Sequence, residues 1–425
     1  MIVRKNWHSG SIMKKASLFL VSIILVSLPM VAQGVTPSVA IAPMTLITRL
    51  SEGDQTYGMV VRGKNIYLFG NVTGVVSTDG YVQALDESGQ VQWSLALDSG
   101  QNEIATAATI DARGSIWILG SSATVSATPI PSPSDTSTVT STPSATALNP
   151  DSVLVDPALP LRQDLTNVIA WKVSRSGNLL GTFTLAMDRP VLVRTAISTS
   201  AGIAFAGIAS TASGSAGFYA TFDLDGLMSS PLSLGKADSE LNALAKMANN
   251  TVGIFGASSE SISGAKLMGL RDGIISSVSS AGKLGKVVRS WNSKSTRSWQ
   301  SATNSLFLGG DSVTAGKMEA VVTKFSSTFA PTWTTRYPSS SPAMTADGII
   351  SRFALFSSTS PIQGVKGWKP ASQTSITIAF NAKGVITGAY RVAGTPISIG
   401  YTRDLGVVVL GRGASGVSIF HTLTR

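Results

Sequence analysis

The stretch that decides the fold runs from Tyr81 to Ala123 and reads YVQALDESGQVQWSLALDSGQNEIATAATIDARGSIWILGSSA. Two strand-like runs separated by a polar turn at Gly89 are followed by ATIDARG and then by IWILG. The same frame returns as VIAWKVSRSGNLLGTFTL, GFYATFDLDGLMSSPLSL, IISSVSSAGKLGKVVRS, VVTKFSSTFAPTWTTRY and ITIAFNAKGVITGAYRV. A repeat of short strands with a period of roughly 40–50 residues predicts a β-propeller.

The glycines support this period. One series ends the second-half strand of each repeat and consists of Gly70, Gly120, Gly207, Gly256, Gly309 and Gly411. Its spacings are 50, 87, 49, 53 and 102 residues, where the 87 contains an insertion and the 102 spans two repeats. Phe356 stands where the missing glycine is expected.

We therefore expect an all-β fold, a seven-bladed β-propeller of four-stranded antiparallel blades. The first blade is predicted at residues 58–61, 66–69, 82–86 and 91–97, and six complete blades end near residue 391. Three further strands, at 398–402, 407–410 and 417–422, lack a fourth. The run TLITRL at 45–50 is predicted to supply it and to close the ring, which removes exposed sheet edges.

The N-terminus has the layout of a secretory signal peptide. From Met13 the chain reads MKKASLFLVSIILVSLPMVAQG, in which two lysines precede an apolar run and small residues follow. We assign 1–34 to a signal peptide, with Met13 as an alternative start and a retained signal anchor as the alternative interpretation. Residues 35–44 are predicted to be a short linker. Residues 45–425 form the single propeller domain, which is expected to be exported and extracellular or associated with the cell envelope.

The longest insertion covers about 122–166. Its first part is a Ser/Thr/Pro tract with too little apolar mass to fold on its own. Its second part, DSVLVDPALPLRQDL, is more apolar and is a candidate for contact with a partner. Two shorter insertions follow near 257–272 and 357–373.

Two motifs resemble known repeat families. ALDESGQVQW at 84–93 resembles the repeat of pyrroloquinoline-quinone (PQQ)-like propellers, and ATIDARGSIWILGSS at 108–122 resembles the repeat of secreted bacterial β-propellers of the SBBP type. The resemblance implies the fold and an extracytoplasmic setting, and it implies no activity. Quinoprotein dehydrogenases of the PQQ type have vicinal cysteines and usually eight blades, whereas this chain has no cysteine. No cofactor is therefore expected.

The sequence offers few groups for catalysis. With no cysteine and two histidines, of which only His421 follows the signal, Ser-His-Asp, Cys-His and His-rich metal sites are excluded. The acidic pairs Asp86/Glu87, Asp223/Asp225 and Glu52/Asp54 are interpreted as polar turns, because FDLDG at 222–226 lacks the later ligands of a calcium loop. We expect no catalytic residue and no metal site.

Charge is uneven along the chain. Residues 1–264 carry 15 basic and 18 acidic residues, whereas residues 265–425 carry 18 basic and 5 acidic, a net charge of +13. Many of these bases, and three aromatic residues, are expected on the face formed by the connections between strands D and A and between strands B and C. The candidate partner-binding residues are Lys266, Arg271, Trp291, Lys294, Arg297, Lys317, Arg336, Tyr337, Lys366, Trp368 and Lys369. Basic groups interleaved with aromatic rings suit anionic ligands, and the alternative is a generally basic surface without a specific ligand.

The favoured function is a non-catalytic binding or scaffolding module at the cell envelope that contacts a protein or an anionic polymer or glycan. One alternative is a carbohydrate-active or quinone-dependent enzyme with its site at the channel mouth, and another is a surface antigen or adhesin. Clustered carboxylates in perturbed environments at the channel mouth favour the enzyme, and a flat mixed surface favours the binding module. Nucleic acid is not an expected partner, and a membrane contact is expected only through an uncleaved signal anchor.

Overall fold

The computed structural model describes residues 38–50, 55–73, 77–124, 161–372 and 374–422. All of them belong to a compact unit from Ser38 to Arg425. The predicted signal peptide, the pair Glu52/Asp54 and most of the long insertion lie outside the described residues. Within the described part, the chain forms thirty strands and one short 3-10 turn, Ala248–Asn250, and contains no α-helix.

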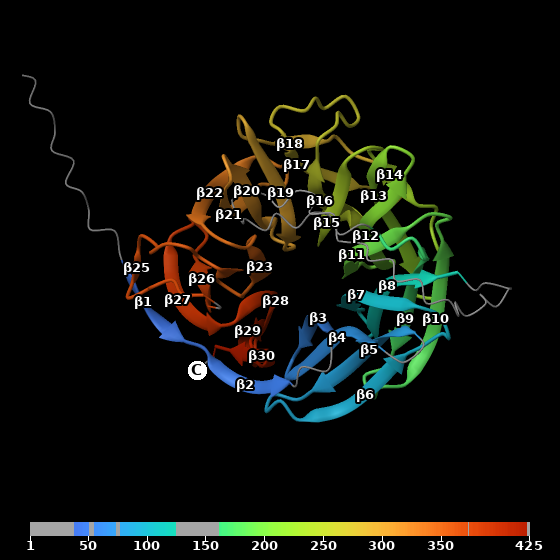
Figure 1. Ribbon diagram of the computed structural model, residues 1–425, viewed down its shortest axis with the longest axis horizontal. Helices are drawn as coiled ribbons and strands as arrows, with labels where there is room; N and C mark the ends of the chain where they lie inside the picture. The colour runs from blue at the N-terminus through green and yellow to red at the C-terminus, as the bar shows by residue number, and fades with distance from the viewer. Residues whose placement is uncertain (1–37, 51–54, 74–76, 125–160, 373, 423–425) are drawn as a thin grey trace, which may run out of the picture. The chain divides into compact units, whose positions relative to one another are not determined.

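The strands form six antiparallel sheets of four strands each, arranged around a central axis (Figure 1). The first two blades comprise β3 (Gln55–Arg62), β4 (Asn65–Thr73), β5 (Thr78–Leu85) and β6 (Val91–Leu97), then β7 (Glu103–Ile110), β8 (Ile116–Ala123), β9 (Leu165–Val173) and β10 (Leu179–Ala186). The next two comprise β11 (Val191–Ser198), β12 (Gly202–Thr211), β13 (Gly214–Asp223) and β14 (Leu232–Leu234), then β15 (Ser239–Lys246), β16 (Val252–Ser258), β17 (Asp272–Val278) and β18 (Val288–Ser290). The last two comprise β19 (Ser295–Ala302), β20 (Phe307–Thr314), β21 (Lys317–Phe325) and β22 (Pro331–Pro338), then β28 (Thr395–Thr402), β29 (Gly406–Gly413), β30 (Gly416–His421) and β2 (Thr45–Leu50).

The remaining sheet has six strands, and it corrects the predicted architecture. Its order is β23-β24-β26-β27-β1-β25, formed by β23 (Met344–Asp347), β24 (Arg352–Phe356), β26 (Thr374–Phe380), β27 (Ile386–Ala393), β1 (Val39–Pro43) and β25 (Val365–Lys366). The prediction of seven four-stranded blades is therefore wrong, because only six blades have four strands. The extra strands come from segments outside the repeat: β1 adds in parallel to the edge of β27, and β25 adds in parallel to β1.

The N-terminal strands join two neighbouring sheets. β1 lies within the stretch 35–44 that was expected to be a linker, so this expectation is corrected for residues 39–43. After Pro43 the chain continues as β2, which pairs antiparallel with β30 as the outermost strand of its blade. Figure 1 shows both blue strands along the outer edges of the orange and red C-terminal strands. The predicted closing role of residues 45–50 is thus confirmed.

The core lies between the sheets. The described residues contain seven hydrophobic clusters, and each is built from two neighbouring sheets. One of them joins the blade of β28–β30 to the blade of β3–β6, for example through Leu410 and Leu68. The first and last sheets therefore bury apolar surface against each other, and the ring is closed by packing as well as by β2.

The repeated glycines have a local structural cause. In all six four-stranded blades the innermost strand has a β-bulge opposite a glycine of the second strand. At Gly207 an added Cβ atom would lie 2.0 Å from the carbonyl oxygen of Leu192, and at Gly256 it would lie 1.9 Å from that of Glu240. At Phe356 the pairing of β23 with β24 has no bulge, so a side chain fits there.

Candidate functional site

Because successive strands are antiparallel, the connections between them alternate between the two ends of the ring. The D–A and B–C connections share one end, which we call the loop face. Its described connections include residues 98–102, 235–238, 259–271, 291–294, 315–316 and 357–372. On the other face the A–B and C–D connections are mostly tight polar turns. One of them is 223–227, where Asp223 accepts hydrogen bonds from the backbone N–H groups of Asp225 and Leu227 at 2.9 and 2.8 Å. The interpretation of that acidic pair as a turn is confirmed.

Arg271 is the centre of a charged group on the loop face. Its guanidinium forms ion pairs with Asp238 and, at 3.3 Å, with Glu240. Its carbonyl oxygen accepts the backbone N–H of Arg297 at 2.8 Å. Burial alone would raise the pKa of Asp238, but the hydrogen bonds from Arg271 and Ser259 together with the charge of Arg271 outweigh it and lower that pKa. The connection 259–271 is thereby held against β15 and β19.

Arg297 and Asp311 are the most strongly perturbed members of this group. Arg297 is 5% exposed, and its guanidinium lies over the Trp299 ring at 4.6 Å from the ring centroid. Burial and then the nearby Arg336 lower the pKa of Arg297 to about 10. Burial and then the charge of Glu240 raise the pKa of Asp311 to about 7.

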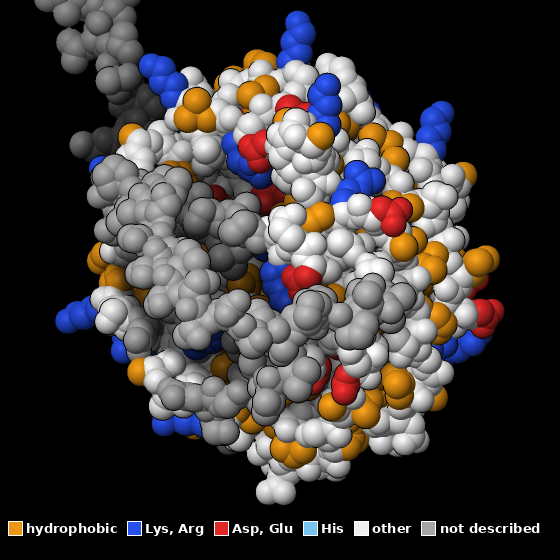
Figure 2. All heavy atoms as spheres, turned by 45° about the vertical axis from the view of Figure 1, so that its right-hand side comes forward, with side chains coloured by type: hydrophobic (Ala, Val, Ile, Leu, Met, Phe, Trp, Pro, Cys, Tyr) orange, Lys and Arg blue, Asp and Glu red, His pale blue; other side chains and the backbone are white. Residues whose placement is uncertain are grey.

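Arg336 completes the group through an ion pair with Glu319 at 3.7 Å. We call the whole set the arginine–carboxylate cluster. It contains Arg271, Arg297, Arg336, Asp238, Glu240, Asp311 and Glu319. Figure 2 shows basic and acidic side chains beside one another around the central hollow. Two of the arginines are ion-paired within the cluster and Arg297 is almost fully buried, so the cluster positions loops and is not an open anion site.

The fold therefore brings together three of the residues that the sequence selected. These residues are Arg271, Arg297 and Arg336, which lie in the arginine–carboxylate cluster. The four acids of the cluster were not selected from the sequence, namely Asp238, Glu240, Asp311 and Glu319. No sequence signal could find these acids, because each lies on a different strand or connection and their proximity depends on how two blades pack together.

The other candidate residues divide into exposed and buried groups. Five lysines are exposed on or next to connections of the loop face, namely Lys266, Lys294, Lys317, Lys366 and Lys369. Two aromatic candidates are core residues: Tyr337 is 7% exposed and stacks on Phe356, and Trp368 is 3% exposed. The Trp368 indole N–H donates to the Ser358 hydroxyl at 3.0 Å. The expectation that these two rings contact a partner is corrected, because packing between sheets buries them.

Trp291 has the opposite environment. Its side chain is 45% exposed, and Met268 and Leu270 are 54% and 62% exposed. The Leu270 N–H donates to the carbonyl oxygen of Ser295 at 2.9 Å, so the two connections lie against each other. We call Met268, Leu270 and Trp291 the Trp291 patch. Lys266 and Lys294 belong to the same two connections.

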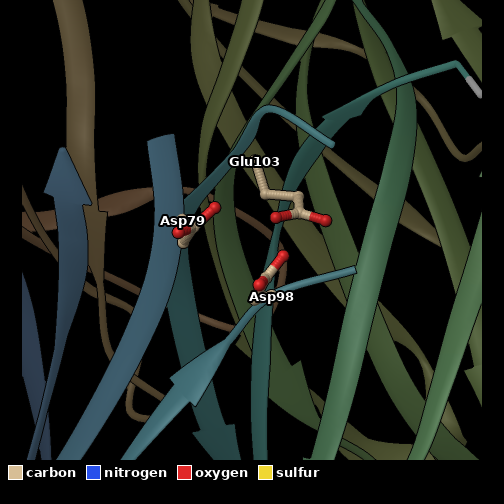
Figure 3. Close-up of side chains that lie close together, drawn as sticks. All are labelled: Asp79, Asp98 and Glu103. Carbon is tan, nitrogen blue, oxygen red and sulfur yellow. The ribbon is translucent and has the colours of Figure 1, made fainter. Parts of the chain in front are cut away.

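A separate acidic group lies on the loop face near β5, β6 and β7. Asp79, Asp98 and Glu103 each place a carboxylate oxygen within 4.8 Å of the others, and Figure 3 shows the three side chains directed toward one another. These residues were also missed from the sequence. This group is the candidate for a bound cation, and it is separate from the arginine–carboxylate cluster.

The channel and the single histidine offer little for catalysis. A central cavity of about 320 Å³ is lined by residues of the innermost strands, including Arg194, Asn242 and Gln300. His421 ends β30 and borders a different cavity beside Tyr390. In the described part of the chain, no helix is long and apolar enough to cross a membrane.

Comparison with known proteins supports the fold and leaves the family open. No family model matches the chain, and no curated protein matches it. The suspected SBBP-type repeat is therefore not confirmed, but solved β-propellers are similar in structure. Sqt1 from Chaetomium thermophilum, bound to the N-terminus of the ribosomal protein L10, is 10% identical with a TM-score of 0.50, covering 89% of this chain and 100% of that chain.

Two further propellers are more distant. BamB from Moraxella catarrhalis is 11% identical with a TM-score of 0.41, over 89% of this chain and 100% of that chain. YCF48 bound to D1 peptide is 10% identical with a TM-score of 0.47, over 92% of this chain and 98% of that chain. At such low identity these likenesses concern the fold and identify no shared activity.

Proposed function

We propose that this protein is an exported, non-catalytic scaffold that binds an acidic segment of a partner protein on its loop face, at the cell envelope or outside the cell. The observation that carries the proposal is the Trp291 patch, with three large apolar side chains exposed beside two lysines. Exposed tryptophan next to charged residues is the composition of a binding hot spot with a polar rim.

The charge of the chain supports an acidic partner. Residues 265–425 have a net charge of +13, and five exposed lysines lie on or next to connections of the loop face. Two arginines of the cluster are ion-paired and Arg297 is buried, so the exposed lysines are the groups left to attract an anion. Long-range attraction of this kind speeds association and weakens as salt rises, because screening shortens its range to about 10 Å at 0.1 M.

The ion pairing favours a scaffold over an enzyme. Asp238, Glu240 and Glu319 each have an arginine partner, whereas a pair of catalytic carboxylates needs access to substrate. A protein segment bound by a ring of this fold has a precedent in Sqt1 with the N-terminus of L10, which supports the class of role. Export rests on the signal-like sequence at 1–34.

The first test uses labelled poly-L-glutamate as a stand-in for an acidic segment, with binding followed by fluorescence anisotropy. We expect binding at low salt that is lost at high salt. The double variant Lys266→Glu/Lys294→Glu should weaken binding by about tenfold or more, because each change reverses a charge near the patch. Lys383→Glu is the matched control, since Lys383 is an exposed lysine in a C–D turn on the opposite face.

Equal weakening by the control and the test variant would contradict a local site and leave only the general positive charge. Tight binding of a polysaccharide such as heparin, with no binding of polyglutamate, would replace the protein partner by an anionic polymer. Secretion is tested separately by locating the chain in cell fractions, where retention in the cytoplasm would contradict export.

A further inference from the structure

Three carboxylates converge on the loop face, and no lysine or arginine of the described residues is paired with them. Asp79 lies near the start of β5, Asp98 follows the end of β6, and Glu103 begins β7. Their nearest oxygens lie within 4.8 Å of one another (Figure 3). Among the described residues, none of the three carboxylates forms an ion pair with a lysine or arginine.

Glu103 is the residue that makes this arrangement informative. Its side chain is fully buried, and Oε1 accepts hydrogen bonds from the Ser99 hydroxyl and, at 2.9 Å, from the Ser99 N–H. Oε2 is buried and has no hydrogen-bond partner within the described structure. A buried carboxylate oxygen without a partner is costly, so it calls for a cation or a proton.

The two aspartates leave one oxygen available in the same way. One oxygen of Asp79 accepts the Ser77 hydroxyl at 2.7 Å, and one oxygen of Asp98 accepts the Gly100 N–H at 2.6 Å. The second oxygen of each accepts no hydrogen bond from the described residues. These aspartates also repel the charge on Glu103, and burial together with this repulsion raises its pKa.

A nearby blade shows how the protein neutralises such groups elsewhere. Ser239 occupies the same place at the start of β15 as Glu103 does at the start of β7. There the carboxylate of Glu260 accepts three backbone N–H groups, of Lys236, Ala237 and Asp238, and the Ser239 hydroxyl. At the start of β17, buried Asp272 accepts the Met268 and Gly269 N–H groups and lies 4.0 Å from Arg289. The group around Glu103 has no such set of donors.

We propose that Asp79, Asp98 and Glu103 bind a divalent cation of the Ca²⁺ class. Calcium ions take oxygen ligands at about 2.3–2.6 Å, so two ligands of one ion lie up to about 5 Å apart, as these oxygens do. Calcium also accepts six to eight oxygens in flexible geometry, and the exposed Asp98 leaves room for water as further ligands. This site departs from the sequence-based expectation of no metal and does not depend on the proposed function.

The position of the site gives the ion a structural effect. Asp79 and Asp98 belong to the blade of β3–β6, whereas Glu103 belongs to the blade of β7–β10. The connection between the blades is held by Asn102, whose side-chain oxygen accepts the Thr78 N–H at 3.1 Å. A bound ion would therefore link two neighbouring blades and relieve the repulsion among three carboxylates.

The test is isothermal titration calorimetry of the full chain with CaCl₂ after treatment with EDTA. We expect one site with a dissociation constant of about 10⁻⁴ M, as is typical of extracellular calcium modules. Glu103→Gln and Asp98→Asn should each weaken binding by about tenfold or more, because fewer charged ligands remain. Asp225→Asn is the matched control, an exposed aspartate in the turn 223–227 on the opposite face.

The temperature of thermal unfolding is a second measurement, and calcium should reverse the difference between the unmodified protein and the variant. In EDTA, Glu103→Gln should unfold at a higher temperature than the unmodified protein, because a buried charge is removed. Addition of CaCl₂ should raise the unfolding temperature of the unmodified protein and leave that of Glu103→Gln almost unchanged. If Glu103→Gln does not fold, Asp98→Asn provides the same comparison at an exposed position.

Absence of calcium binding to the unmodified protein would overturn the proposal and indicate that Glu103 holds a proton. Calcium binding that survives both Glu103→Gln and Asp98→Asn would overturn it as well, because the ion would then bind elsewhere.

Discussion

At the scale of single residues, Asp311 shows how the fold perturbs an ordinary carboxyl group. Its side chain is partly buried beside Glu240, Arg271 and Arg297, and its pKa rises from the usual 3.8 to about 7. Because the folded state holds the proton more tightly than the unfolded chain, this group makes the protein less stable as pH rises from about 4 to 7. Above pH 7 the penalty stays constant.

The prediction concerns Asp311→Asn. At pH 5 the variant should be more stable than the unmodified protein by a smaller amount than at pH 8, because the unfolded chain ionises Asp311 from about pH 4 while the folded protein still holds the proton. At pH 8 the variant should be more stable by about 1–3 kcal/mol, because one pKa unit corresponds to about 1.4 kcal/mol and partial exposure reduces the effect. Urea unfolding at both pH values measures the difference. An effect of equal size at both would contradict the pKa shift.

The sequence alone could not predict the arginine–carboxylate cluster that surrounds Asp311. Lysines and arginines on the loop face were found, because the repeat places them in or next to the D–A and B–C connections. Their acidic partners were missed, and so was the acidic group around Glu103, because both sets are assembled from separate repeats. Tyr337 and Trp368 were misassigned for a related reason: both were expected in loops, and such a position gives no indication that a ring packs into the core, where Tyr337 lies on β22.

At the scale of elements, the pairing of the two inner strands explains the glycine period. A bulge in the innermost strand brings a carbonyl oxygen against the glycine of the second strand, as at Leu192 and Gly207. Gly207→Ala should therefore destabilise the protein by about 1–3 kcal/mol, since backbone must move to admit the methyl group.

Gly413→Ala is the control for that prediction. Gly413 also lies in a second strand, β29, but the nearest atom to an added Cβ is the Gly416 oxygen at 3.9 Å. Chemical unfolding should show a change below about 0.5 kcal/mol for this variant. Similar losses at both positions would mean that the bulge is not the cause.

The strand-level prediction was correct where the repeat is regular and wrong where segments outside it add to a sheet. Residues 45–50 were recognised because their apolar pattern resembles that of an outermost strand, and β2 pairs with β30 as expected. β1 and β25 are short, lack the repeat and join an edge in parallel. Edge addition depends on main-chain hydrogen bonds and leaves little trace in sequence, so the six-stranded sheet could not be predicted.

At the scale of the whole molecule, the two parts of the chain differ in net charge and in the surface group that each carries. The first 264 residues have a net charge of −3 and hold the acidic group around Glu103, whereas the remainder has a net charge of +13 and holds the Trp291 patch. Both features lie on the loop face, supported by a ring closed through packing of its first and last sheets. The ring presents its loop face, which is the part we expect to select a partner.

The central claim is that the Trp291 patch holds a protein partner, and partner capture with matched variants tests it most directly. The unmodified chain, Leu270→Asp and Leu227→Asp would be used to capture proteins from the envelope fraction of the source cells, and each recovered protein would be purified and its affinity measured. Leu227 is the control, because it is 75% exposed on the opposite face. We predict a partner with an acidic segment whose affinity falls at least about tenfold with Leu270→Asp, since a charge in a hot spot typically costs more than 1 kcal/mol, and is unchanged with Leu227→Asp. A partner that binds Leu270→Asp as tightly as the unmodified chain would contradict the claim.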